Sequence, residues 1–289
     1  MREAVADLID VIALEERETD CFRGLTPDMG WKRVFGGQVV AQALAAALAT
    51  VEPERHVHSL HGYFLRPGDP KQPIDYAVDR FRDGKSFTTR GVVARQGAEI
   101  IFTMSSSFHL EETGFDHQVS MPEVRRPDDL PDQQALLRDD DSHMPPAMKQ
   151  FFQRRWPVEI RPVDPEGFVD PASRRATVRC IWLRALGRLP ADPKVHLCTL
   201  AYASDLNLID AALLPHGRSL FDADLMLASL DHAMWFHRPF RADEWLLFVQ
   251  ESPSASGARG FNRGLIFTAD GLLVASVVQE GLMRIRRSQ

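Results

Sequence analysis

The chain has 289 residues, of which 44% are hydrophobic and 26% charged, so it is long enough to bury a core without disulfide support. Its formal net charge of −6 argues against general nucleic-acid binding. Three cysteines in a chain of this length do not form a disulfide framework and favour a reducing compartment.

The sequence shows no targeting, membrane or metal motif. The first residues lack the basic start and apolar run of a signal peptide. The longest mostly apolar stretch, 39–51, is too short to cross a bilayer. No C-x-x-C pair or H-E-x-x-H string is present. We therefore expect a cytoplasmic protein that uses no metal or cofactor and has no membrane partner.

The first 110 residues alternate between helical and strand patterns. Apolar residues have helical spacing over 4–18, and a short strand is expected near 20–25. Gly36-Gly37 opens an Ala-rich helix over 38–50, where the glycines let other backbone approach the first turn. Strands separated by turns such as Asp83-Gly84 are predicted at 56–65, 74–81, 87–95 and 99–110.

The middle of the chain has a different composition. Nine of the 19 prolines fall between Pro122 and Pro171, together with acidic clusters such as 139–141. This composition predicts a connector with short helices at most, at 133–138 and 147–154.

The pattern of the first part then returns. Pro193 stands at a permitted first-turn position before a predicted helix over 195–214. Strands are predicted at 177–185, 227–236, 245–252, 260–268 and 272–283.

Short matches between the two halves indicate a duplication. Arg66-Pro67 matches Arg238-Pro239 at an offset of 238 − 66 = 172, and Arg90-Gly91 matches Arg263-Gly264 at 263 − 90 = 173. Gln38 in the first helix falls near Asp205 in the second, at an offset of 205 − 38 = 167.

We therefore predict an α+β fold. Two units, 1–115 and 173–289, are joined by the Pro-rich connector 116–172. Each unit packs one helix against an antiparallel sheet, and the two sheets continue edge to edge, which hides their edge strands. Clefts are expected where the units meet.

Three polar residues stand among apolar neighbours in the second half: Asp205 in YASDLN, Ser229 in LASLDH and Gln279 in VASVVQEG. Each also has a purely structural interpretation, as a helix cap, a strand-end hydroxyl or an edge amide. As a set they suit water activation, because a carboxylate accepts a proton while a hydroxyl and an amide orient the water. No G-x-S-x-G is present, which argues against a covalent acyl-enzyme of the α/β-hydrolase type.

Several long strings closely resemble the acyl-CoA thioesterase II family, in the same order over nearly the whole chain. The resemblance implies a double hotdog fold, in which two helices are each wrapped by an antiparallel sheet. It also implies hydrolysis of acyl-CoA to a free fatty acid and CoA. The family's catalytic Asp, Thr or Ser, and Gln fall on Asp205, Ser229 and Gln279, with Ser229 departing from the common Thr. The strings are FGGQVVAQAL (35–44), HSLHGYFLRPGD (58–69), YASDLN (202–207), DHAMWFHRPF (231–240), EWLLF (244–248), ARGFNRG (258–264) and VQEG (278–281).

Other residues remain candidates for parts of the site. His58 is the alternative base, and His61, His232 and His237 lie in neighbouring predicted strands. Backbone N–H groups at Gly36, Gly37 and Gln38 are candidates to polarise the thioester carbonyl. The candidates for CoA phosphates are Arg66, Arg90, Arg238 and Arg263.

Two other functions stay open at this level. A hydratase or dehydratase acting on acyl-thioesters would use a His with an acid, and no duplicated pair of that kind is visible in the helices. A silent acyl-CoA-binding module would lack the three polar residues. We also expect a homo-oligomer, dimer or tetramer. Acyl-chain length preference does not follow from these patterns.

Overall fold

The computed structural model describes residues 2–27, 32–132, 135–136, 146–153, 156–170 and 177–286. In these residues the helices are α1 (Arg2–Ile12), α2 (Gly36–Ala49), α4 (Pro146–Gln153), α5 (Pro165–Val169) and α6 (Pro193–Ser204), with 3-10 helices η1 (Pro127–Asp129) and η3 (Ile209–His216). The predicted unit boundary at 172/173, the cluster 139–141 and most of the predicted helix 133–138 lie outside the described residues.

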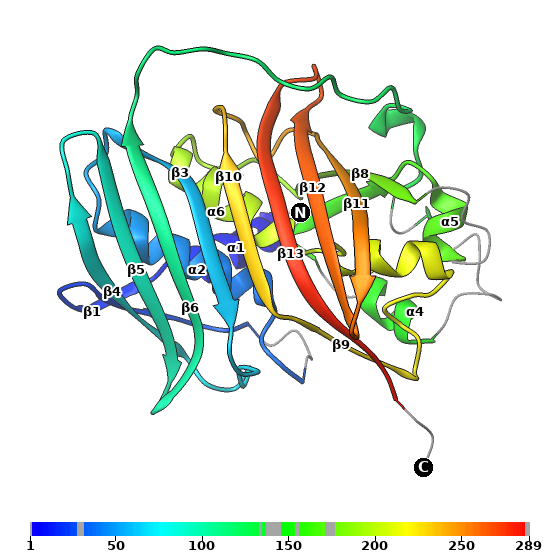
Figure 1. Cartoon of the computed structure of the whole chain (residues 1–289), viewed down its shortest axis with the longest axis horizontal. Coiled ribbons are helices and arrows are strands. Elements are labelled where there is room, and N and C mark those ends of the chain that lie inside the picture. Colours follow the sequence, from blue (N-terminus) through cyan, green and yellow to red (C-terminus); the bar gives the residue numbers. More distant parts are fainter. Residues whose placement is uncertain are drawn as a thin grey trace.

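Thirteen described strands form a single sheet in which every pairing is antiparallel. Their order is β1-β2-β4-β5-β6-β3-β10-β13-β12-β11-β8-β7, and β9 also pairs with β13. The sheet therefore runs without a break from the first half to the second through β3 and β10 (Figure 1), as predicted. The strands are β1 (Glu15–Glu18), β2 (Cys21–Gly24), β3 (Arg55–Phe64), β4 (Ile74–Asp83), β5 (Phe87–Gln96), β6 (Glu99–Leu110), β7 (Val158–Pro162), β8 (Val178–Ala185), β9 (Leu225–Ser229), β10 (Asp231–Phe236), β11 (Leu246–Ser256), β12 (Arg259–Thr268) and β13 (Leu273–Ile285).

The central β3–β10 pairing shows the internal symmetry. An offset of 172 residues sends Ser59 to Asp231 and Tyr63 to Trp235. It therefore exchanges the pair Ser59–Trp235 with the pair Tyr63–Asp231. A pseudo-two-fold axis passes by His61 and its partner Ala233, and the offset is the one that the Arg-Pro match predicts.

The second match is displaced by one residue. Under the same symmetry, the β5–β6 pair corresponds to the β12–β13 pair. Ser106 then corresponds to Gln279, and its strand partner Arg90 corresponds to Asn262, the partner of Gln279. The predicted match of Arg90 with Arg263 is therefore wrong. A one-residue slip in a strand moves a side chain to the opposite face. Arg90 is accordingly buried, whereas Arg263 is exposed and pairs with Glu251.

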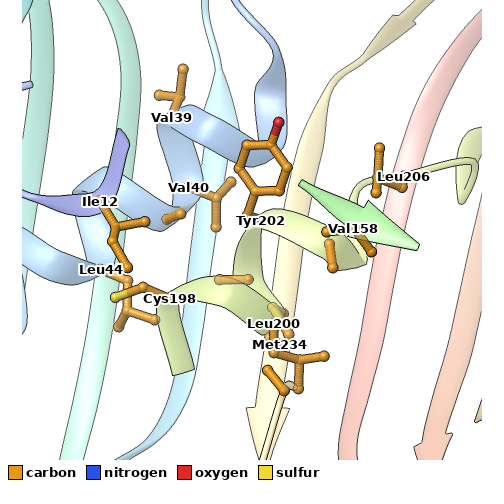
Figure 2. Packing of buried hydrophobic residues seen from close by; sticks show 14 of the residues in the cluster. Ile12, Val39, Val40, Leu44, Val158, Cys198, Leu200, Tyr202, Leu206 and Met234 are labelled. Carbon is orange, nitrogen blue, oxygen red and sulfur yellow. The ribbon is translucent and has the colours of Figure 1, made fainter. Parts of the chain in front are cut away.

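The main core lies between the sheet and the helices on one of its faces. Helix α2 is buried along almost its whole length and packs against α6, with α1 beside both. Figure 2 shows Val40 and Leu44 of α2 beside Tyr202 and Cys198 of α6, all in one apolar cluster. The stretch Pro193–His216 is long and apolar enough to span a membrane, but 89% of its most apolar window is buried inside the protein. It is thus part of this core.

The first part of the connector covers the other face of the second half of the sheet, whereas Met148 and Trp156 of its later part join the main core. Leu130, Met121 and Val124 pack on a cluster that contains Trp182 of β8 and Phe267 of β12. The indole N–H of Trp182 donates to the carbonyl of Arg125 at 2.9 Å. In Figure 1 the connector crosses above the sheet to reach this side.

Four predicted elements differ in extent. The first helix ends at Ile12, and the following Glu15–Glu18 forms an exposed edge strand instead of its last turn. The connector contains a strand as well as helices, because β7 pairs with β8 at the sheet edge, where a flanking proline is tolerated. The run predicted over 227–236 is two strands that break at Leu230, and the helix predicted over 195–214 stops at Ser204. The helix predicted at 147–154 is confirmed by α4.

Candidate active site

Asp205 lies at the point where α6 ends. Its backbone is still helical, but Asn207 has a left-handed conformation (φ 61°), which asparagine tolerates better than most residues and which stops the helix. The buried guanidinium of Arg179 donates to the carbonyl of Asn207 and pairs with the carboxylate of Asp210. This ion pair holds the turn that presents Asp205. Because the residues on both sides of this turn are apolar, the sequence pattern predicts one continuous helix across it.

The carboxylate of Asp205 is buried and hydrogen-bonded. Gln279 Nε2 donates to Asp205 Oδ1 at 2.6 Å, and the backbone N–H of Gly37 also donates to this carboxylate. Burial raises the pKa of Asp205 to about 6, against the opposing effect of these two hydrogen bonds. A carboxylate with this pKa is a stronger base than an exposed one and is still ionised at neutral pH.

Two glycines allow the start of α2 to approach Asp205. A Cβ at Gly36 would lie 2.7 Å from Asp205 Oδ2, and a Cβ at Gly37 would lie 2.3 Å from the carbonyl oxygen of Tyr202. Both contacts are closer than a side chain permits. The predicted role of the glycine pair, close approach of other backbone, is therefore observed, and the approaching backbone is the end of α6. The predicted correspondence of Gln38 with Asp205 is wrong, because Gln38 lies in the first turn of α2 whereas Asp205 lies at the end of α6.

Gln279 lies on β13 and contacts a histidine as well as Asp205. Its Nε2 is 3.2 Å from Nδ1 of His232, which lies on β10, and Nε2 of His232 is 2.9 Å from Ser204 Oγ. Burial lowers the pKa of His232 to about 4, so the imidazole is neutral. The 3.9 Å approach of His232 to Asp205 is therefore not an ion pair.

Ser229 is the last residue of β9 and pairs with Gly281, two residues beyond Gln279 on β13. It is half-buried and lines the same cavity as Asp205. In the described part of the chain, its hydroxyl is hydrogen-bonded to neither Asp205 nor Gln279. The structure therefore joins Asp205 and Gln279 directly. Asp205 and Ser229 line the cavity, whereas Gln279 is fully buried and does not line it.

The cavity itself has a volume of about 750 Å³, within the range of pockets that bind small molecules. Its apolar wall comes from both halves and from the connector, which contributes Trp156. Three cationic residues, Lys32, Arg33 and Arg66, also line it. The apolar lining residues are Val34, Phe35, Val39, Phe64, Pro67, Ile101, Trp156, Leu206, Ile209, Leu220, Leu227 and Ala228.

Most of the other sequence candidates lie elsewhere. His58 is hydrogen-bonded to Ser107 and packs near Phe87, and it does not line the cavity. Of the four arginines, only Arg66 lines the cavity, where it also pairs with Glu99. The other three, Arg90, Arg238 and Arg263, form ion pairs with Asp83, Asp116 and Glu251.

The described residues of the first half hold no equivalent set of side chains. Thr50 follows the end of α2 as Asp205 follows the end of α6. In the strands, the equivalent of Gln279 is Ser106 and the equivalent of His232 is Leu60. The side chain of Arg90 fills the corresponding space in the first half, where its Nε donates to Thr50 Oγ1 at 2.9 Å. The duplicated fold thus carries one carboxylate–amide–imidazole set in its described residues.

The fold is shared with known proteins. The structure superposes on a hot dog-fold protein from Alicyclobacillus acidocaldarius with a TM-score of 0.78 over 97% of this chain and 99% of that one, at 19% identity. Together with the two helices packed on one continuous antiparallel sheet, this confirms the predicted α+β double hotdog fold.

Sequence similarity then gives the family. Residues 25–109 match the acyl-CoA thioesterase N-terminal domain, and residues 148–282 match acyl-CoA thioesterase. The chain is 39% identical to acyl-CoA thioesterase 2 of Haemophilus influenzae, covering 98% of this chain and 99% of that protein. It is 43% identical to an acyl-CoA thioesterase II from Mycobacterium marinum, with a TM-score of 0.79 over 96% of this chain and 98% of that one. The chain belongs to the acyl-CoA thioesterase family, a family of thioester hydrolases, as its strings predict.

Proposed function

We propose that this protein hydrolyses fatty acyl-CoA to a free fatty acid and CoA, by direct attack of a water molecule that Asp205 activates. The observation that carries the proposal is the buried carboxylate of Asp205, hydrogen-bonded to Gln279 and facing a largely apolar cavity. The apolar wall suits an acyl chain. The cationic residues Lys32, Arg33 and Arg66 suit the phosphates of CoA.

In this mechanism Asp205 accepts a proton from the water as the oxygen attacks the thioester carbonyl carbon. The C–S bond then breaks, and CoA leaves as a thiolate. Gln279 holds the carboxylate through Nε2. Its Oε1 is buried and accepts no hydrogen bond from the described residues, and we infer that it orients the water beside Asp205. The hydroxyl of Ser229 holds the water from the cavity side. The start of α2 is proposed to polarise the carbonyl, although the N–H of Gly37 is used by Asp205.

A covalent mechanism has less support. Burial raises the pKa of Cys180 to about 11 and that of Cys198 to about 12, which disfavours a thiolate nucleophile. Neither thiol lines the cavity. A dehydratase-type His–acid pair is also disfavoured, because both ring nitrogens of His232 are already hydrogen-bonded, to Ser204 and to Gln279. The predicted division into units 1–115 and 173–289, the homo-oligomer and the cytoplasmic location stay predictions.

The test is Asp205→Asn, which removes the base and keeps the shape. We expect kcat for release of free thiol from acyl-CoA to fall by about 10²–10⁴-fold, with a much smaller change in KM, because the lost interaction acts in the transition state. Ser229→Thr keeps the hydroxyl and should be mild, whereas Ser229→Ala and Gln279→Ala should each be damaging. A folded Asp205→Asn protein with near-normal turnover would exclude the mechanism.

A further inference from the structure

Three hydrogen bonds link Asp205, Gln279, His232 and Ser204 at the end of α6. The contacts are Gln279 Nε2 to Asp205 Oδ1 at 2.6 Å, Gln279 Nε2 to His232 Nδ1 at 3.2 Å, and His232 Nε2 to Ser204 Oγ at 2.9 Å. The peptide bond between Ser204 and Asp205 closes these contacts into a ring. It ties the helix end to β13 and β10.

The direction of every hydrogen bond in this ring follows from chemistry. An ionised carboxylate only accepts, so the amide atom that faces Asp205 must be Nε2 of Gln279. That nitrogen carries only donors, so Nδ1 of His232 must be unprotonated and accept the second N–H. The imidazole proton is then on Nε2 and donates to Ser204 Oγ, whose own proton goes to the carbonyl of Ala201 at 2.9 Å.

Burial supports this assignment. His232 and Gln279 are both fully inaccessible to solvent, so no external water competes for either contact. Without an acceptor at Nδ1 of His232, the amide of Gln279 would keep only one of its two donor contacts. It could then rotate away from the carboxylate or turn its oxygen towards it.

We propose that His232 is a positioning residue for hydrolysis: its Nδ1 accepts the second N–H of Gln279 and thereby holds that amide with the first N–H on Asp205. His232 does not touch the substrate, since it does not line the cavity. The inference rests on the proposed roles of Asp205 and Gln279. It gives a role in orienting the base to a histidine that does not line the cavity.

The fold offers a control on the cost of removing the imidazole. The pseudo-two-fold equivalent of His232 is Leu60, also fully buried on the same face of the sheet. A leucine therefore fits this position of the fold. A second control is His237, which follows the same strand and bonds to the hydroxyl of Ser276 at 2.8 Å, but does not line the cavity.

Two matched substitutions test the hydrogen bonds at Nδ1 and Nε2 of His232 separately. The oxygen of His232→Asn lies near the position of Nδ1 and can still accept from Gln279. The amide of His232→Gln reaches the position of Nε2, keeps the contact with Ser204 and loses the one with Gln279. We expect kcat of His232→Asn to exceed that of His232→Gln and His232→Leu by about tenfold or more, with similar KM values, because a small misplacement of a catalytic group is costly.

The double-mutant cycle with Gln279→Ala tests the route of the effect. If His232 acts through Gln279, His232→Leu should lower kcat in the wild-type background and change it by less than about twofold in the Gln279→Ala background. Equal losses in His232→Asn and His232→Gln, or an undiminished loss in the Gln279→Ala background, would overturn the proposal. His237→Leu should retain wild-type kcat.

Two further readouts keep the outcomes distinct. ¹⁵N NMR of the wild-type protein at pH 7 should show His232 neutral and protonated on Nε2, and the other tautomer would refute the proposal even if the variants fail to fold. Failure of the proposed function has a different signature, namely an active Asp205→Asn protein. That result would leave the tautomer unchanged.

Discussion

At the scale of single residues, the proposed role of Asp205 as the base predicts how activity depends on pH. Burial raises its pKa to about 6, and the base is active only when ionised. We expect kcat to fall as pH falls through about 6, with one proton taken up. His232 does not produce this limb, because burial holds its pKa to about 4. A pH–rate profile that stays flat down to pH 4.5 would show that Asp205 is not the titrating base.

The same carboxylate should weaken the fold at neutral pH, which provides an independent control. An unfolded Asp ionises near 3.8, so between pH 3.8 and 6 the folded protein binds more protons than the unfolded chain, and stability falls as pH rises. The cost above pH 6 is on the order of 3 kcal/mol. Asp205→Asn should therefore have a higher Tm than wild type at pH 7.5, and this advantage should disappear below pH 4.

At the scale of elements, the start of α2 must approach the end of α6 closely. A Cβ at Gly37 would lie 2.3 Å from the Tyr202 carbonyl and 2.6 Å from the ring of Phe35. We expect Gly37→Ala to destabilise the protein by about 1–3 kcal/mol and to lower kcat, because it displaces the N–H that donates to Asp205. Gly114→Ala is the control, since a Cβ there meets nothing within 4 Å. An equal Tm for the two variants would contradict the close approach.

Sequence patterns predicted strands and core helices better than their interruptions. The candidate site lies at these interruptions: α6 stops at Ser204, and the strand run breaks at Leu230. Hydropathy does not reveal either, because the flanking residues remain apolar. The ion pair of Arg179 with Asp210 that holds the first break is a tertiary contact between residues 31 positions apart. Asp205, Ser229 and Gln279 stand out in the sequence as polar residues in apolar surroundings, whereas His232 is one of several strand histidines without a distinguishing local pattern.

At the scale of the whole molecule, the duplication leaves two related positions, and among the described residues only one of them holds a carboxylate, an amide and an imidazole. Under the symmetry that exchanges β3 and β10, Ser106 is the equivalent of Gln279 and Leu60 is the equivalent of His232. In the first half, the related position is occupied by Arg90, which is hydrogen-bonded to Thr50. Buried Arg90 also pairs with Asp83, so its removal would leave a polar site unpaired. The first half therefore supplies Gly37 and part of the cavity wall to the second half.

This asymmetry predicts the binding stoichiometry. A non-hydrolysable acyl-CoA thioether should bind with one molecule per 32.6 kDa chain, because the cavity joins the start of α2 to the end of α6 and the related position is filled by Arg90. Isothermal titration calorimetry measures the ratio directly. Asp205→Asn should keep a ratio of one, since it removes the base and not the cavity. Two molecules per chain in the wild-type protein would mean that the first half retains a binding site, and that Arg90 moves aside to open it.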